Sequence, residues 1–270
     1  MRKAAAFCGL ADEAVERMIG EANAVLSADD SVMERTPVSV MMELLAICER
    51  HTGVADPFAD IKLRSNEDAR RLLPELEEHV RASEDPVALA LRLSAAGNIM
   101  DVGAFDYFDV EAQLRMAEGR VLCGGGEASL KAALSKGGSL ALVADNSGEV
   151  FFDILLLHTL AAAYKLSKVS LVLRDKPFLN DACIGEAVSE GIVDAAGEGI
   201  EVCALPMFLP DGSASLPAAD IVICKGMANF ERLSNDERPH FLFIVKCEPV
   251  AGILRKRTGQ IIREGDWMLL

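Results

Sequence analysis

The chain has 270 residues, of which 51% are hydrophobic and 26% are charged, a composition typical of a globular protein with a substantial core. Its formal net charge of −15 argues against a nucleic acid or an anionic membrane as a partner, because both carry negative charge. The same charge is compatible with a small phosphorylated substrate, since a bound divalent cation reverses the potential locally.

The cysteines and the N-terminus indicate the compartment. Seven cysteines without any C-x-x-C spacing favour reduced thiols over a disulfide framework or a thiolate zinc site. The N-terminus lacks the apolar stretch of a secretory signal, and the longest apolar run, at residues 154–164, is too short to cross a bilayer. We therefore expect a cytoplasmic protein with no membrane partner. The sequence does not define an oligomeric state.

Residues 1–117 have the pattern of a helical region. Apolar residues recur at helical spacing between charged ones, most clearly at residues 40–48 and 87–95. Residues 66–80 are rich in Glu, Arg and Leu, and Pro74 within them predicts a break or a kink. We expect residues 1–117 to form a helical domain or cap.

From residue 118 onward, short apolar runs of strand length alternate with helical stretches and Gly-rich turns. The predicted strands cover residues 139–144, 169–173, 200–203, 220–224 and 241–245, and the clearest helices between them cover residues 149–166 and 181–190. Continuous apolar strands separated by helices predict a mostly parallel sheet that is covered on both faces. We therefore predict an α/β fold, with a doubly wound sheet domain at residues 118–270 and the helical domain packed against it.

Polar residues follow the ends of three of these strands. Asp145 and Asn146 follow one strand, Asp181 lies after the next, and Lys225 and Gly226 follow a third. In open α/β sheets, ligands bind beyond the carboxyl ends of the strands, so these residues are expected to share one edge. Oxygen donors suit Mg²⁺ or Mn²⁺, and so small a set leaves room for water and a phosphate. A lysine and a glycine N–H are suited to phosphate oxygens.

Each motif taken alone has a simpler interpretation. An Asp-Asn pair at a strand end is more often a turn or a helix N-cap, and Asn180-Asp181 has the same alternative. A lysine beyond a strand usually faces water. The joint occurrence at three strand ends favours a shared site. H-E-x-x-H, Walker A, G-x-G-x-x-G and G-x-S-x-G motifs are absent from the sequence.

The segment Asp145–Asp153, with the sequence DNSGEVFFD, resembles the D-N-A-G-E-x-x-x-D signature of the damage-control phosphatase family. Further stretches that resemble the microbial branch of this family are residues 174–182, 224–231 and 95–101, and Asp56-Pro57-Phe58 with Lys62 and Asn66. The similarity extends from about residue 36 to residue 250. Ser147 stands where the signature usually has Ala, and the paired N-terminal cysteines of many relatives are missing.

The resemblance implies an α/β domain with a helical domain against it and a bound Mn²⁺, Mg²⁺, Co²⁺ or Ni²⁺ ion. Its ligands would be Asp145, Asn146 and Asp181, which would also act in catalysis together with Lys225. Lys225 and Asn229 match the phosphate-side loop of the family, and Gly226 lies between them in the matching stretch. The other matching positions would contact the substrate or support the ligands; they are Glu149, Asp153, Lys62, Asn66, Asn98 and Asp101.

The predicted function is metal-dependent hydrolysis of small phosphorylated metabolites by direct attack of water. Asp145 or Asp181 as a nucleophile is an alternative, but Ser147 stands where that route needs a second Asp. An S-adenosylmethionine-dependent carboxyl methyltransferase, proposed for a relative of the family, is a second alternative. The third is a protein that binds a metal and a metabolite without catalysis.

Overall fold

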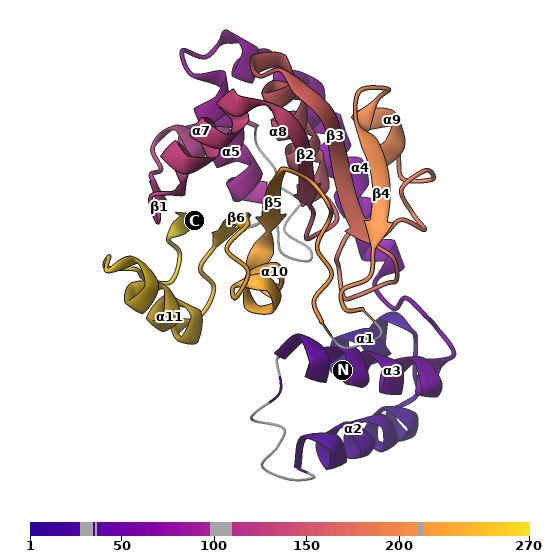
Figure 1. Ribbon diagram of the computed structural model, residues 1–270. Coiled ribbons are helices and arrows are strands. Elements are labelled where there is room, and N and C mark those ends of the chain that lie inside the picture. Colours follow the sequence, from indigo (N-terminus) through magenta and orange to yellow (C-terminus); the bar gives the residue numbers. More distant parts are fainter. Residues whose placement is uncertain (28–34, 36, 98–109, 210–212) are drawn as a thin grey trace.

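The computed structural model describes residues 1–27, 35, 37–97, 110–209 and 213–270 (Figure 1). The first half contains α1 (Arg2–Phe7), α2 (Asp12–Ser27), α3 (Pro37–Thr52), α4 (Ala59–Ala82), α5 (Pro86–Gly97) and α6 (Val110–Glu118). Of the break or kink predicted at Pro74, the break is wrong, because α4 continues through the proline. Buried residues lie on both sides of the proline, so packing holds the helix together across it.

The second half contains β1 (Leu122–Cys123), α7 (Gly126–Lys136), β2 (Gly138–Val143), α8 (Glu149–Ala163), β3 (Leu166–Arg174), α9 (Ile192–Ala196), β4 (Glu201–Leu205), β5 (Ile221–Lys225), α10 (Gly226–Leu233), β6 (Pro239–Ile244), α11 (Glu248–Thr258) and β7 (Trp267–Leu269). The strands form one seven-stranded sheet in the order β1-β7-β6-β5-β2-β3-β4. All pairs are parallel except β6 with β7. The predicted α/β fold with a mostly parallel sheet is confirmed. No described helix is long and apolar enough to cross a bilayer.

The sheet is covered on both faces, as a doubly wound fold requires. In β2, Leu140 and Leu142 belong to the hydrophobic cluster that includes α4, α5 and α8, whereas Ala141 and Val143 belong to the cluster with α10 and α11. This alternation follows from the two-residue period of a strand. It explains why the strands read as continuous apolar runs in the sequence.

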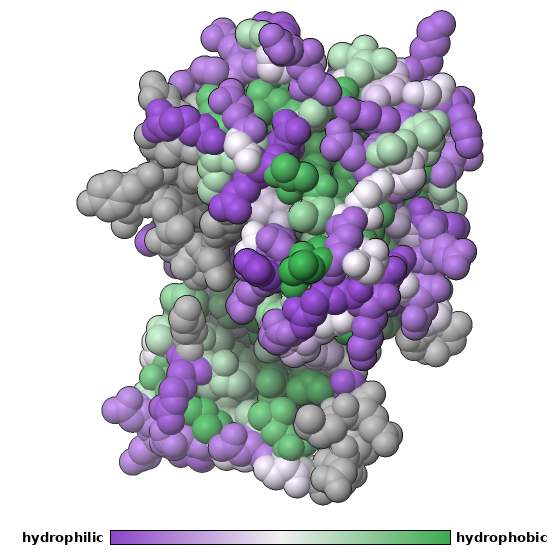
Figure 2. All heavy atoms as spheres, turned by 90° about the vertical axis from the view of Figure 1, so that its left-hand side faces the viewer, coloured by the Kyte–Doolittle hydropathy of each residue, from purple (hydrophilic) through white to green (hydrophobic). Residues whose placement is uncertain are grey.

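Helices α1 to α3 form a lobe beyond the carboxyl ends of β3 and β4 (Figure 1). The lobe has a small hydrophobic cluster of its own. It contacts the rest of the molecule through Val38 of α3, which packs with Phe178 and Met207 from the loops after β3 and β4. Figure 2 shows hydrophobic residues where the lobe meets the body. Helices α4 and α5 share the core of the sheet instead. The domain boundary at residue 117 stays a prediction.

One predicted helix is wrong. Residues 181–190 form turns rather than an α-helix. The Ala182 N–H donates to the carbonyl of Asp145 (2.8 Å), the Arg174 N–H donates to the carbonyl of Ala182 (3.0 Å), and the Ile184 N–H donates to the carbonyl of Arg174 (2.9 Å). These bonds to β3 and to the loop after β2 occupy the backbone groups that a helix would use internally.

Candidate active site

The candidate site lies at the topological switch point of the sheet. Strand β2 has β5 on one side and β3 on the other. Because the chain leaves β2 toward β3 and leaves β5 toward β6, the two connections diverge and open a crevice at their carboxyl ends. The two ends meet closely: a Cβ atom on Gly226 would lie 1.9 Å from Asp145 Oδ2, and the φ of Gly226 is +77°. Glycine is therefore required at this position.

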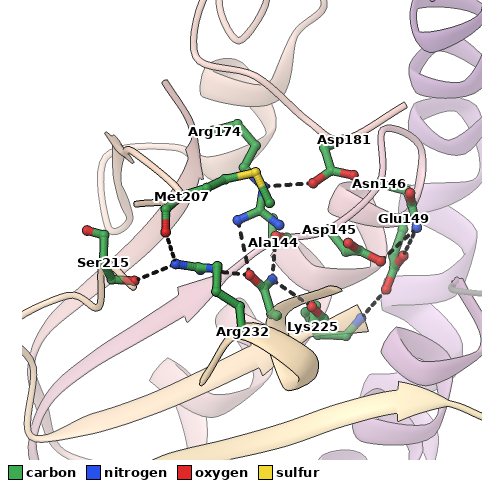
Figure 3. A network of polar contacts seen from close by, with 11 residues as sticks. Ala144, Asp145, Asn146, Glu149, Arg174, Asp181, Met207, Ser215, Lys225 and Arg232 are labelled. Carbon is green, nitrogen blue, oxygen red and sulfur yellow. Dashed lines mark hydrogen bonds and ion pairs between the residues drawn. The ribbon is translucent and has the colours of Figure 1, made fainter. Parts of the chain in front are cut away.

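The three predicted metal ligands are brought together by backbone pairing. Asn146 and Asp181 form an antiparallel bridge, and the Ala182 N–H donates to the carbonyl of Asp145 (2.8 Å). All three ligand side chains are largely buried, with exposed fractions of 9% or less. Two segments that are distant in sequence thus present two carboxylates and an amide at one point of the sheet edge (Figure 3).

Asp145, Asn146 and Asp181 do not act as helix caps in the structure. The N-cap of α8 is Gly148, and no side chain caps this helix. Asn180 and Asp181 are followed by turns at residues 184–190, so they have no α-helix to cap there. The polar side chains are left to interact with one another.

Lys225 lies beneath the loop after β2 and is fully buried. Its Nζ donates to Glu149 Oε1 (2.6 Å), to Asp153 Oδ1 (2.7 Å) and to the carbonyl of Ser94 (2.8 Å). Glu149 Oε2 in turn accepts from Asn146 Nδ2 (3.0 Å). The predicted phosphate-binding lysine therefore has protein partners for its ammonium, and Glu149 joins it to a predicted ligand (Figure 3).

Arg174, the last residue of β3, supports Asp181 from the other side. Its Nε donates to Asp181 Oδ2 (2.7 Å), and its Nη1 donates to Asn229 Oδ1 (3.0 Å). Asn229 is fully buried, and its Nδ2 donates to the carbonyl of Lys225 (2.7 Å). Asn229 thus links the end of β5 to the arginine that holds Asp181, a contact that the sequence alone did not identify.

The electrostatics of the edge suit a cation. Burial raises the pKa of Asp145 well above its ordinary value, and the neighbouring carboxylates of Asp181 and Glu149 raise it further. Burial also raises the pKa of Asp181, which the guanidinium of Arg174 partly opposes. A divalent ion would favour the ionised form of both aspartates. The available donors are oxygens, as Mg²⁺ and Mn²⁺ prefer, so these residues fit such an ion.

The candidate metal ligands do not form a complete coordination shell. Among the residues that the structure describes, no three His, Cys, Asp or Glu side chains gather into a possible metal centre. The candidate ligand set therefore depends on the amide oxygen of Asn146 in addition to the two aspartates. An incomplete protein shell leaves positions for water and a substrate, which a structural metal site does not.

Lys62 and Asn66 of α4 are buried, and Asn66 contacts the same loop. Lys62 forms ion pairs with Asp56 (2.5 Å) and with Glu186. Asn66 Oδ1 accepts from the Gly148 N–H (2.6 Å), at the start of α8. Asn98 and Asp101, the two other predicted substrate contacts from this half, lie outside the described residues.

Sequence reasoning missed Lys246. It directly follows the buried Val245 at the carboxyl end of β6, and its side chain is exposed. Its positive charge is close enough to lower the pKa of Asp145, against the larger effect of burial. No ion pair of its ammonium is found among the described residues. The strand-end rule, applied to the predicted strand 241–245, would have identified it.

Comparisons with known proteins find similar proteins over most of the chain. The sequence profile of the damage-control phosphatase ARMT1-like domain matches residues 2–262. A damage-control phosphatase of Archaeoglobus fulgidus is 34% identical over 220 residues, which cover 78% of this chain and 76% of the relative. The damage-control phosphatase PH1575 of Pyrococcus horikoshii is 27% identical over 218 residues, covering 78% and 75%.

The fold has a close counterpart among solved structures. The crystal structure of a DUF89 family protein of Pyrococcus horikoshii matches with a TM-score of 0.79 and 22% identity, covering 99% of this chain and 93% of the other. Because the profile match spans nearly the whole chain and the relatives cover most of it, the phosphatase function predicted from the sequence is confirmed at the level of the family. The chain belongs to the damage-control phosphatase ARMT1-like domain family.

Proposed function

We propose that this chain is a divalent-metal-dependent phosphomonoesterase for small phosphorylated metabolites, with Asp145, Asn146 and Asp181 as metal ligands. The observation that carries the proposal is the convergence of these three oxygen donors at the β2–β5 switch point, in a buried environment with an excess of carboxylates. The relatives named damage-control phosphatases support the phosphatase part of the proposal. Mn²⁺, Mg²⁺, Co²⁺ and Ni²⁺ are the candidate ions.

The residues of the chain would divide the work as follows. When bound, the ion supplies a Lewis acid for a phosphoryl oxygen and acidifies water. Arg174 holds the carboxylate of Asp181 in place through its Nε. The exposed ammonium of Lys246, at the end of β6, is placed to attract the phosphate and to neutralise its oxygens. Hydrolysis breaks the ester P–O bond and yields an alcohol and inorganic phosphate.

Direct attack by water is the favoured route. An aspartyl-phosphate route of the kind considered for Asp145 needs a second acid two residues later, where this chain has Ser147. Ser147 is only 2% exposed, so it offers neither an acid nor an accessible hydroxyl. The aspartates are thus assigned to the ion rather than to the phosphorus.

The non-phosphate part of the substrate has a candidate place at the same edge of the sheet. A groove of about 550 Å³ lies between α3 and the loops after β3 and β4. It is lined mostly by apolar side chains, among them Leu45, Phe178 and Met207, with Lys176 also present. A volume of this size suits a small metabolite.

The test is phosphate release from p-nitrophenyl phosphate by the purified chain, with Mn²⁺ and with a chelator. We expect activity with the metal, its loss with the chelator, and a loss of about 100-fold or more in Asp145→Asn, which keeps the side-chain shape but removes a ligand charge. Asp194→Asn, the same change at an exposed residue of α9, serves as the matched control. Full activity of Asp145→Asn, or full activity in chelator, would refute the metal assignment.

A further inference from the structure

We propose that Lys225 is a positioning residue that orients the amide of Asn146 through Glu149, rather than a residue that contacts the phosphate. The inference rests on the proposed function in one respect, namely that Asn146 Oδ1 is a ligand of the ion. The Lys225–Glu149 pair then affects the affinity for the metal, and Lys246 is the lysine that binds the phosphate.

The first step is the direction in which Lys225 points. It is the last residue of β5 and shares the parity of Ile221 and Ile223, whose side chains pack in the cluster with α5 and α8. By the two-residue period of a strand, its side chain enters that face of the sheet instead of the edge where a substrate would arrive. Glu149 and Asp153 of α8 are the acids that meet it there.

The second step is the hydrogen-bonding capacity of the ammonium. An ammonium has three N–H donors, and Lys225 Nζ has three acceptors within 2.8 Å, namely Glu149 Oε1, Asp153 Oδ1 and the carbonyl of Ser94. The side chain is 0% exposed. A phosphate could reach it only by displacing a buried carboxylate, which is costly.

The third step is the transfer of orientation to the ligand. Glu149 binds Lys225 with Oε1 and accepts from Asn146 Nδ2 with Oε2 (3.0 Å). The same Nδ2 donates to Asp145 Oδ2 (3.0 Å). Because carboxylates only accept, the NH₂ end of the amide must face these two acids. The carbonyl end, Asn146 Oδ1, therefore faces away from them and is the end available to a cation.

The experiment uses Glu149→Gln in the full chain. Glutamine has the same shape but only one acceptor end, so it cannot accept from both Lys225 and Asn146. One donor is left unsatisfied, and the orientation of the Asn146 amide is no longer enforced. We expect the dissociation constant for Mn²⁺, measured by calorimetry and by electron paramagnetic resonance, to rise about 10–100-fold. With Mn²⁺ at saturation, the inhibition constant of inorganic phosphate should change by less than about twofold.

Two matched variants complete the design. Asp153→Asn makes the same change of charge in the same cluster, but its Oδ1 can still accept from Lys225 and from Ser94 Oγ, and it does not touch Asn146. Its Mn²⁺ affinity should stay within about threefold of the wild type. Lys246→Met should show the opposite pattern, with a phosphate inhibition constant at least about 10-fold weaker and little change in Mn²⁺ affinity.

The outcomes are distinguishable. If Glu149→Gln binds Mn²⁺ as the wild type does while Asp145→Asn does not, the positioning role is wrong and the metal site stands. If Glu149→Gln weakens phosphate and leaves Mn²⁺ binding unchanged, the pair acts on the phosphate and the inference is overturned. If the wild type itself binds no divalent ion, the proposed function fails together with the inference.

Discussion

Two buried lysines, Lys225 and Lys62, form ion pairs close to the candidate site, and the acids around them differ in their exposure to solvent. Lys225 faces Glu149 and Asp153, and all three side chains are 0% exposed. Lys62 is also 0% exposed, but the side chains of its partners Asp56 and Glu186 retain 14% and 17% of their exposure. Each cluster therefore pairs one ammonium with two carboxylates. The Lys225 cluster is shielded from solvent, and the carboxylates of the Lys62 cluster are partly exposed.

The clusters also end on different parts of the loop. The Lys225 cluster ends on the side chain of Asn146, through Glu149. On the side of Lys62, it is Asn66, one helical turn further along α4, that reaches the loop, and it binds the backbone N–H of Gly148. One lysine between two carboxylates therefore has a different role in each cluster. The Lys225 cluster orients the side chain of Asn146. The Lys62 cluster lies next to Asn66, whose hydrogen bond fixes the backbone at Gly148.

The largest expected effect is a difference in the free energy of unfolding when the lysine of each cluster is replaced. Lys225→Met leaves two fully buried carboxylates without a cation, and we expect a loss of about 3–5 kcal/mol in the free energy of unfolding. Lys62→Met should lose less, about 1–3 kcal/mol, because its carboxylates keep contact with water. Urea denaturation of the metal-free proteins measures both. Equal losses would show that residual exposure does not distinguish the clusters.

A second prediction uses pH to sharpen the comparison. Burial raises the pKa of Glu186 from 4.5 to about 7, although Lys62 opposes the rise. Between these two values the folded chain holds a proton that the unfolded chain has released, so this group makes the protein more stable as the pH falls. The advantage is lost as the pH rises through about 7.

The matching variant is Glu186→Gln, which removes this titration. We expect the unfolding midpoint of the metal-free wild type to rise relative to that of Glu186→Gln as the pH is lowered from about 8 to about 5.5, in a thermal scan with chelator present. The other raised carboxylates are common to both proteins and cancel in the difference. Midpoints that run parallel over this range would contradict a raised pKa at Glu186.

Much of the fold could be predicted because its determinants are local. Residues 139–144 and 220–224 read as strands since both faces of the sheet are covered, which makes all positions after the first in each run apolar. The stretch 181–190 could not be predicted, because its backbone bonds to β3 and to Asp145, which are distant in sequence. Local propensity carries no information about such partners.

The candidate site was predictable to the same degree. The strand-end rule identified Asp145, Asn146 and Asp181, and the structure brings them together. It did not give the direction of Lys225, because it treats every residue near a strand end as facing the edge. The parity of Lys225 with Ile223 contained the answer, since both point to α8.

The smallest expected effect concerns Ser147, which lies between Asn146, held by Glu149, and Gly148, held by Asn66. Ser147 is 2% exposed, and its Oγ has no hydrogen-bond partner among the described residues. Its N–H donates to the carbonyl of Asn180 (2.8 Å), a bond that any residue can make. Ser147→Ala should therefore leave Mn²⁺ affinity and phosphatase activity within about twofold and should add up to about 1 kcal/mol to the free energy of unfolding, because a buried unsatisfied hydroxyl is removed.

The control for this prediction is Ser94→Ala. Ser94 is also buried, but its Oγ donates to Asp153 Oδ1 (2.6 Å) within the Lys225 cluster. Removing this hydroxyl should lower the free energy of unfolding by about 1–2 kcal/mol. Urea denaturation of both variants beside the wild type gives the comparison. A loss above about 1 kcal/mol in Ser147→Ala would mean that the hydroxyl has a partner after all. The loop would then be held at a third point, and the division of labour between the two lysine clusters would be incomplete.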